Sequence, residues 1–273
     1  MLTPTINSRA LLVCALVVSA APAFAQYRPR PTQSTSPAEN YHVELSAGFW
    51  NPSADMQITD TAQGLAGSNI DLKKDLGLVD KKFPEFQLVI KPALKHKIRV
   101  QFIPISYAQT ATTSRDLAFN GQTYPAGSTI SSTLDWKAWR FGYEYDVRSS
   151  YRGFLGVIVD VKYTDVGATL TSGGRVGVAS AKAPIPALGG IGRLYLASNL
   201  SVTAELTGFD LPGSWIKTTS GHYADVDMYA MLNFSDQISV KGGYRKFDVA
   251  YTLTNDTGTF KLDGWYFGGA LRF

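Results

Sequence analysis

Histidine close to acidic side chains is the combination in this sequence that could do chemistry, because histidine exchanges protons near neutral pH and a carboxylate can orient it. Of the three histidines, His222 is the one that two acids follow closely, Asp225 and Asp227. Side chains of an extended strand alternate between two faces. The side chain of His222 is therefore on one face of its strand, and those of both aspartates are on the other. Ser220 has no supporting acid, and strand-face charge explains the two aspartates better than a weak cation site. The spacing therefore predicts no catalytic residue.

The remaining polar motifs also have simple structural explanations. His96 lies in the basic turn Lys95-His96-Lys97, and His42 opens a segment on its polar face. The glycine pairs Gly173-Gly174 and Gly189-Gly190 lack the following helix and the Lys-Ser/Thr pair that a phosphate-binding loop needs. We therefore expect no cofactor, no metal and no phosphate-binding site.

Residues 1–25 have the features of a secretory signal. An apolar stretch, Ala10–Ala21, follows Arg9 and leads to the small-residue site Ala23-Phe24-Ala25, which predicts cleavage after Ala25. A retained anchor is the alternative, but the stretch is shorter than the ~20 residues that a spanning helix needs. Cleavage removes Cys14, the only cysteine, which excludes disulfides, thiolate nucleophiles and cysteine-bound metals from the mature chain.

The mature chain has a nearly balanced charge. Removing residues 1–25 takes away Arg9 and no acid, which lowers the net charge from +4 to +3. This charge is small and the basic residues do not gather into a block, so no nucleic-acid partner is expected. Residues 26–40 are rich in Pro, Ser, Thr and Gln without an apolar period, which predicts a disordered lead-in.

From Tyr41 onward the hydrophobic period is two, which predicts β-strands. In the first segment Val43 and Leu45 share a face with Tyr41, and His42 and Glu44 occupy the other. Ten segments alternate in this way, near residues 41–50, 83–91, 97–107, 132–147, 153–164, 187–197, 200–209, 223–234, 238–251 and 258–273. No later apolar run is long enough for a membrane-spanning helix, so a chain that enters a membrane must do so as a closed barrel.

The connectors between these segments alternate in length. The short ones are 92–96, 148–152, 198–199 and 235–237, and the long ones are 51–82, 108–131, 165–186, 210–222 and 252–257. Short turns at one end and long loops at the other are typical of outer-membrane barrels, in which the short turns are periplasmic.

The polar face of the segments is charged, and the apolar face is arranged like one that contacts lipid. On the apolar face, Trp, Tyr and Phe lie toward segment ends and smaller apolar residues toward the middles, as in barrels with aromatic girdles. A solvated outer face of a soluble sheet is the alternative explanation of the charge alone. The charged residues are Glu44, Glu85, Lys97, Arg99, Arg140, Glu144, Asp146, Asp160, Lys162, Arg193, Glu205, Asp225, Asp227, Lys241, Arg245 and Arg272.

We predict an all-β fold, a single transmembrane antiparallel up-and-down β-barrel over residues 41–273, with about ten strands and eight as the alternative. The acids and bases of the lumen are nearly balanced and should pair, because an unpaired buried charge is costly. Ten strands lie near the eight whose interior side chains can fill, so we expect a narrow pore at most. Tyr266 and Arg272 of the last strand should face this lumen.

Two long connectors carry local signals. Asn120-Gly121 is typical of a type I′ hairpin turn, which predicts that the second connector is two extended strands capped by this turn. In the first connector, Asn69 or Asp71 can cap a short helix through Leu76 that Gly77 ends.

The last segment resembles the terminal strand of bacterial outer-membrane β-barrel proteins. Trp265, Phe267, Leu271 and the final Phe273 match the positions where that superfamily carries aromatic or apolar residues, and Gly269 departs from the pattern. The resemblance implies a Gram-negative-type outer membrane, contact with its lipids and lipopolysaccharide, and a barrel-assembly machinery that reads the strand ending in Phe273. It implies no activity.

Three functions remain open from the sequence. The first is a non-enzymatic outer-membrane barrel with a structural, surface-interaction or narrow-pore role. The second is an outer-membrane hydrolase that cleaves lipid or peptide through His222, and the third is a small selective porin.

Overall fold

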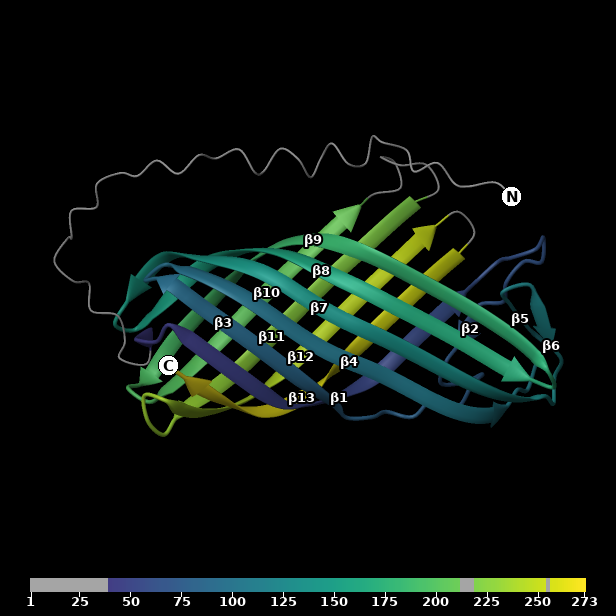
Figure 1. Ribbon diagram of the computed structural model, residues 1–273, viewed down its shortest axis with the longest axis horizontal. Coiled ribbons are helices and arrows are strands. Elements are labelled where there is room, and N and C mark those ends of the chain that lie inside the picture. Colours follow the sequence, from purple (N-terminus) through teal and green to yellow (C-terminus); the bar gives the residue numbers. More distant parts are fainter. Residues whose placement is uncertain (1–38, 212–218, 254–255) are drawn as a thin grey trace. The chain divides into compact units, whose positions relative to one another are not determined.

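The structure is a computed structural model that describes residues 39–211, 219–253 and 256–273 (Figure 1). The predicted signal, its cleavage after Ala25 and most of the lead-in 26–40 lie outside these residues. Of the lead-in, only Glu39 and Asn40 are described, and Glu39 is buried. Within the described ranges, no helix is long and apolar enough to cross a membrane.

Ten long antiparallel strands form a closed barrel, as the sequence predicted. Each pairs with its neighbour along the chain, and the last pairs with the first. The strands are β1 (Val43–Thr59), β3 (Phe83–Ala93), β4 (His96–Thr112), β7 (Thr129–Ser150), β8 (Gly153–Ser172), β9 (Arg175–Ala197), β10 (Leu200–Leu211), β11 (Thr219–Asn233), β12 (Ile238–Leu253) and β13 (Asp256–Arg272).

The barrel is closed by the pairing of β1 with β13. In this register Glu44 lies opposite Arg272 and Leu45 opposite Leu271. At the strand ends, the Phe273 carbonyl accepts from the Val43 amide at 3.0 Å and the Phe273 amide donates to the Val43 carbonyl at 2.9 Å. These Val43–Phe273 contacts lie at the end of the barrel that carries the short turns, which we call the turn end. We call the opposite end the loop end.

Several strands extend farther toward the loop end than the sequence predicted. The connector expected over 165–186 is mostly strand, because β8 and β9 continue until a tight turn at Gly173-Gly174. Both glycines have positive φ, 53° and 81°, which glycine adopts without steric cost. Likewise β1 runs to Thr59, well inside the connector expected over 51–82.

These extensions escaped prediction because the sense of the alternation inverts partway along the strands. Near the turn end of β1, Glu44 points inward and Leu45 outward, with 47% of Leu45 exposed. Nearer the loop end, Met56 points inward with 1% exposed, and Asp55 points outward. A wall that meets lipid must be apolar, whereas a wall that meets water is polar and can enclose an apolar core. The inversion therefore marks where the barrel wall passes from lipid to water.

The barrel interior consequently has two layers. Toward the turn end it is filled by charged side chains, and every residue predicted to face the lumen is buried there except Asp227, which is half-buried. Toward the loop end it is an apolar core that the sequence analysis did not predict. Residues from the barrel wall in this core include Trp50, Met56, Ile58, Ile103, Ile105, Ile130, Leu134, Trp136, Leu170, Phe247, Phe260 and Leu262.

The second long connector folds into this core as a separate hairpin. Strands β5 (Leu117–Phe119) and β6 (Gln122–Tyr124) form a sheet of their own. The predicted type I′ turn is confirmed, because Asn120 and Gly121 have φ of 49° and 70°. The expectation that the turn caps continuous extensions of the flanking strands is wrong, since β4 ends at Thr112 and β7 starts at Thr129. Burial of the apolar hairpin residues explains why the connector turns inward.

The first long connector supplies the other inward-packed segment. Strand β2 (Ile70–Asp71) pairs with β1, and the predicted helix is only a hydrogen-bonded turn. Asp71 caps the turn by accepting from the Lys73 and Lys74 amides, both at 3.0 Å. Gly77 ends the turn with φ of 66°, which leaves too few residues between cap and glycine for a helix. Leu72 and Leu76 are buried in the core.

Candidate functional site

The histidine and acid pair considered from the sequence does not form a site. His222 is exposed, whereas Asp225 is buried in the lumen, so the predicted separation of their faces is confirmed. Asp225 accepts from Lys162 at 2.9 Å and from Arg245 at 2.8 Å. Its carboxylate is therefore fully engaged with cations on the opposite side of the wall from His222.

The other histidines lie at the turn end, where His96 is half-buried. Nδ1 of His96 and the hydroxyl of Tyr143 form a hydrogen bond of 2.5 Å. His42 is exposed beside the start of β1. Over the described ranges, no group of three or more His, Cys, Asp or Glu side chains could hold a metal ion.

The lumen charges form a connected set of ion pairs, and one part of it centres on Glu205 of β10. Arg99 from β4 binds Glu205 at 2.8 Å and Glu144 at 3.1 Å. Arg140 from β7 binds both Glu205 and Asp160, the latter at 2.7 Å. These contacts join strands from different parts of the wall, so ion pairs bridge the interior.

A second part of the network centres on Arg245 of β12, which is fully buried. Its guanidinium binds Asp225 at 2.8 Å, donates to Gln101 Oε1 at 2.9 Å and lies 3.4 Å from Glu85. Lys162 links Asp225 to Asp160, which already belongs to the first part. The two parts therefore form one continuous network of ion pairs across the barrel interior.

Glu39 seals the turn end of the same network, and the sequence analysis missed it. It precedes the first strand but enters the lumen, where its carboxylate accepts from Arg193 at 2.8 Å and from the Tyr195 hydroxyl at 2.7 Å. Lys91 Nζ donates to the Glu39 carbonyl at 2.7 Å. Its position in a segment rich in Pro, Ser and Thr gave no periodic signal.

With Glu39 included, the charges of the described lumen balance. The buried cations are nine: Lys91, Lys97, Arg99, Arg140, Lys162, Arg193, Lys241, Arg245 and Arg272. The buried lumen acids are eight: Glu39, Glu44, Glu85, Glu144, Asp146, Asp160, Glu205 and Asp225. Half-buried Asp227 makes the acids equal in number to the cations. The predicted near balance of acids and bases is therefore present, and most of these charges pair directly. Lys241 instead donates to Gln87 at 3.0 Å, and Asp227 accepts from the Tyr266 hydroxyl at 2.8 Å.

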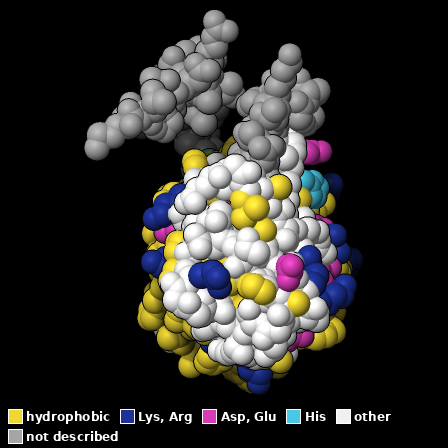
Figure 2. Space-filling model, turned by 90° about the vertical axis from the view of Figure 1, so that its right-hand side faces the viewer, with side chains coloured by type: hydrophobic (Ala, Val, Ile, Leu, Met, Phe, Trp, Pro, Cys, Tyr) yellow, Lys and Arg dark blue, Asp and Glu magenta, His cyan; other side chains and the backbone are white. Residues whose placement is uncertain are grey.

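At the loop end, the two inward-packed connectors are tied to each other by Arg115. Its guanidinium binds the Asp75 carboxylate through two nitrogens, at 2.6 and 3.0 Å, and donates to the Asn69 carbonyl at 2.6 Å. The hydrogen bonds from Arg115 lower the pKa of Asp75 from its ordinary value. We call this contact the Arg115–Asp75 tie. Where the described residues are visible in the view onto the loop end, their atoms are packed together and show no open channel mouth (Figure 2).

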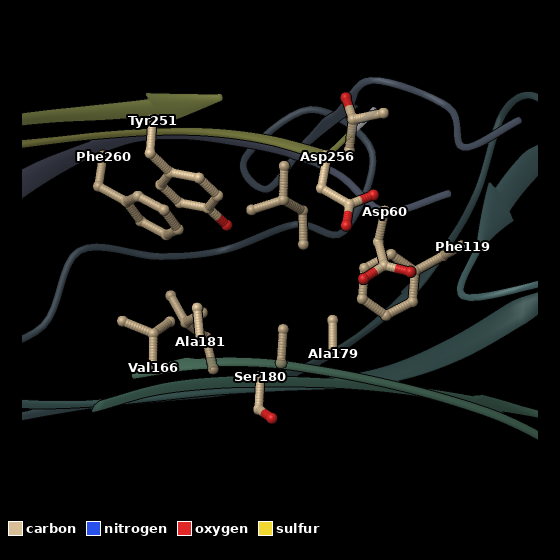
Figure 3. Close-up of a pocket in the computed structure, with 13 residues that line it drawn as sticks. Asp60, Phe119, Val166, Ala179, Ser180, Ala181, Tyr251, Asp256 and Phe260 are labelled. Carbon is tan, nitrogen blue, oxygen red and sulfur yellow. The ribbon is translucent and has the colours of Figure 1, made fainter. Parts of the chain in front are cut away.

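A cavity of about 80 Å³ lies in the apolar layer at the loop end. Figure 3 shows Asp60, Asp256 and Phe119 at one end of it and Tyr251, Phe260 and Val166 at the other. Leu134, Ala168, Ala179 and Ala181 complete much of the apolar lining. We call it the loop-end cavity. No motif in the sequence indicates it, because its two acids come from opposite ends of the chain.

The closed antiparallel barrel, with an outward apolar band and a charged interior, defines the class: it is the fold of outer-membrane β-barrel proteins, as the sequence predicted. This fold supports a location in the outer membrane. No family model matches the chain, and no curated protein matches it in sequence.

Among solved structures, the outer membrane protease OmpT from Escherichia coli is similar with a TM-score of 0.55 and 9% identity, over 89% of this chain and 99% of that chain. Ail, the attachment invasion locus protein of Yersinia pestis, has a TM-score of 0.38 and 10% identity, over 85% of this chain and 99% of that chain. OprG from Pseudomonas aeruginosa has a TM-score of 0.30 and 12% identity, over 85% and 96%. At 9% identity the likeness to OmpT concerns the fold and not the activity.

Proposed function

We propose that this protein is a closed, non-enzymatic outer-membrane barrel that acts through its loop end, which faces outside the cell. The observation that carries the proposal is the double filling of the lumen. A network of ion pairs closes the layer near the turn end, and two connectors fill the layer near the loop end. This arrangement supports a surface-interaction role over transport.

A path for solutes through this lumen would have to break buried ion pairs. Each pair lost leaves charges in a poorly solvated interior, at a cost of several kcal/mol. At the turn end, Glu39 closes the lumen further through its ion pair with Arg193. At the loop end, the Arg115–Asp75 tie holds the two connectors in place. The narrow pore and the selective porin left open by the sequence are therefore both disfavoured.

Swelling of proteoliposomes in solutions of small sugars tests the closed state. Vesicles that contain the refolded mature protein should swell no faster than empty vesicles. A variant that lacks both Arg245 and Arg140 side chains, each replaced by Ala, is the positive control for an opened lumen if it still shows heat-modifiable migration. Sugar-dependent swelling by the unchanged protein would contradict the proposal.

The proposal assigns no hydrolysis to His222. The side chain is exposed, and its neighbours across the sheet are Asp210 on β10 and Ala250 on β12. The unchanged protein and the His222→Ala variant should both show no hydrolysis of lipid A, phospholipid or peptide substrates. A measurable hydrolysis that the His222→Ala variant loses would restore the hydrolase alternative.

Export and assembly complete the proposal. Residues 1–25 act as the signal, and the barrel-assembly machinery reads the terminal strand that ends in Phe273, after which lipids and lipopolysaccharide surround the apolar band. The outward exposure of Trp265, Phe267 and Phe273 supports this part. Deletion of Phe273 should reduce the heat-modifiable barrel in outer-membrane fractions, whereas Asp236→Asn in an exposed turn should not. Equal barrel levels would argue against recognition of this strand.

A further inference from the structure

The loop-end cavity has an apolar body large enough for a short aliphatic chain. Its volume of about 80 Å³ is close to half of the 150 Å³ that holds benzene in an engineered apolar cavity. Phe119, Tyr251 and Phe260 contribute aromatic surface, and the rings of Tyr251 and Phe260 are stacked with centroids 6.3 Å apart. The cavity therefore favours a slender alkyl group over a ring.

Two carboxylates lie together at one end of the cavity, and both are held in place. Asp60 Oδ1 accepts from Asn120 Nδ2 at 3.1 Å, which links it to the hairpin turn. Asp256 Oδ1 accepts from the Thr61 amide at 2.8 Å. Figure 3 shows both carboxylates beside the same open space. Their positions are therefore fixed by the barrel wall and by both inward-packed connectors.

No basic side chain of the described residues forms a salt bridge with either carboxylate. This contrasts with the lumen below, where buried acids such as Asp225 and Glu205 bind at least one cation. Two neighbouring anions and several aromatic faces attract a cation, the first through charge and the second through the ring quadrupole. The lining therefore suits a ligand with a positive charge and a small apolar body.

We propose that the loop-end cavity binds a short alkylammonium ion, with the ammonium between Asp60 and Asp256 and the alkyl chain against Phe119, Tyr251 and Phe260. This inference rests on the proposed surface role and names the class of ligand that the loop end would bind. The two can fail separately, because a chain that binds no amine can still be a closed barrel.

Titration of the refolded mature protein in detergent with n-butylammonium tests the site. Isothermal calorimetry should detect binding of n-butylammonium, and 1-butanol, which has the same shape without the charge, should bind at least tenfold more weakly. Asp60→Asn and Asp256→Asn should each weaken butylammonium binding roughly tenfold, which corresponds to one charge-assisted hydrogen bond. Ala179→Leu, which fills the cavity, should abolish binding of both compounds.

Asp236→Asn is the matched control, because it removes one exposed acid at the turn end, and it should leave the affinity unchanged. All variants must first show heat-modifiable migration, so that loss of binding is not loss of fold. Equal affinity for butylammonium and butanol would overturn the proposal. So would undiminished binding by the folded Asp60→Asn and Asp256→Asn variants, or no binding by the unchanged protein.

Discussion

At the scale of single residues, the structure depends on charged side chains that a soluble protein would expose. Arg245 is the clearest case, because it is fully buried and bridges Asp225, Glu85 and Gln101. A buried ion pair adds little net stability over an apolar pair, yet removing one partner leaves the other charge uncompensated.

Arg245→Ala should therefore destabilise the barrel by about 3 to 5 kcal/mol. Urea unfolding of the protein in lipid vesicles, followed by tryptophan fluorescence, measures the change. Lys182→Ala is the control: Lys182 binds Asp165 at 3.1 Å but its side chain is 60% exposed. Such a surface pair is screened by solvent and contributes little to stability. Equal effects of the two substitutions would contradict the network as described.

The Arg115–Asp75 tie predicts an acid-dependent release of the loop connectors. The folded-state pKa of Asp75 lies below its ordinary value of 3.8, so its stabilisation is complete above that value and is lost as pH falls through the lower folded pKa. The protection of residues 60–82 against hydrogen exchange, relative to an unstructured chain at the same pH, should therefore be constant from pH 8 to about 5 and should fall only below about pH 4.

Asp75→Asn separates this tie from other acids. The variant should show reduced protection at neutral pH and should lack the acid-induced loss of protection in residues 60–82. Protection that changes between pH 5 and 8 in the unchanged protein would contradict the assigned pKa direction.

At the scale of elements, the main structural feature is an exchange of polarity between the inward and outward faces, which occurs partway along strands such as β1. On β8, Val159 and Thr171 both face outward and are both exposed, but Val159 lies in the apolar band and Thr171 near the loop end. Lipid and water therefore contact the same face of one strand at different heights.

A charge placed at these two positions should have different costs. Val159→Arg should destabilise the barrel in vesicles by about 2 to 4 kcal/mol if the residue lies near the bilayer midplane. Thr171→Arg should change stability by less than about 0.5 kcal/mol, as surface substitutions usually do. Urea titration in vesicles measures both. A similar cost at both positions would place the whole strand in one environment.

The sequence predicted the membrane-embedded part of each strand better than the part above it. The alternation of Leu45 and Glu44 identifies a wall with lipid outside, and the same period continues through Asp55 and Met56 with the faces exchanged. A search for one constant apolar face stops near Trp50, where the exchange begins. The change of parity after Trp50 was the signal that could have extended β1.

The candidate site could not be predicted from the sequence for a different reason. Asp60 and Asp256 are far apart along the chain, and only closure of the barrel through β1 and β13 brings them together. The hairpin turn at Asn120-Gly121 was predicted, but its packing against Asp60 depends on tertiary contacts. Leu72, Leu76 and Leu117 in the long connectors were the available hint that these connectors pack inward.

At the scale of the whole molecule, a charged layer and an apolar layer close the same barrel by different physical means. The charged layer is held by ion pairs between strands, and the apolar layer by burial of two connectors in the part of the barrel above the lipid. Glu39 joins the segment before the first strand to the charged layer, where it contacts Arg193, Tyr195 and Lys91.

Glu39→Gln should lower the stability of the barrel by about 1 to 3 kcal/mol, because it weakens hydrogen bonds to buried charged groups. The temperature at which the compact band is lost in gel migration measures the effect. Asp236→Asn should leave that temperature unchanged. A variant as stable as the unchanged protein would show that Glu39 does not seal the turn end.

The most direct test of the closed barrel is single-channel recording of the full mature protein in a planar lipid bilayer. The account predicts no conductance steps from the unchanged protein, because ion pairs and inward-packed connectors occupy its lumen. The Arg140→Ala and Arg245→Ala double variant, if it folds, should produce intermittent steps. Stable, stepwise conductance by the unchanged protein would contradict the closed barrel.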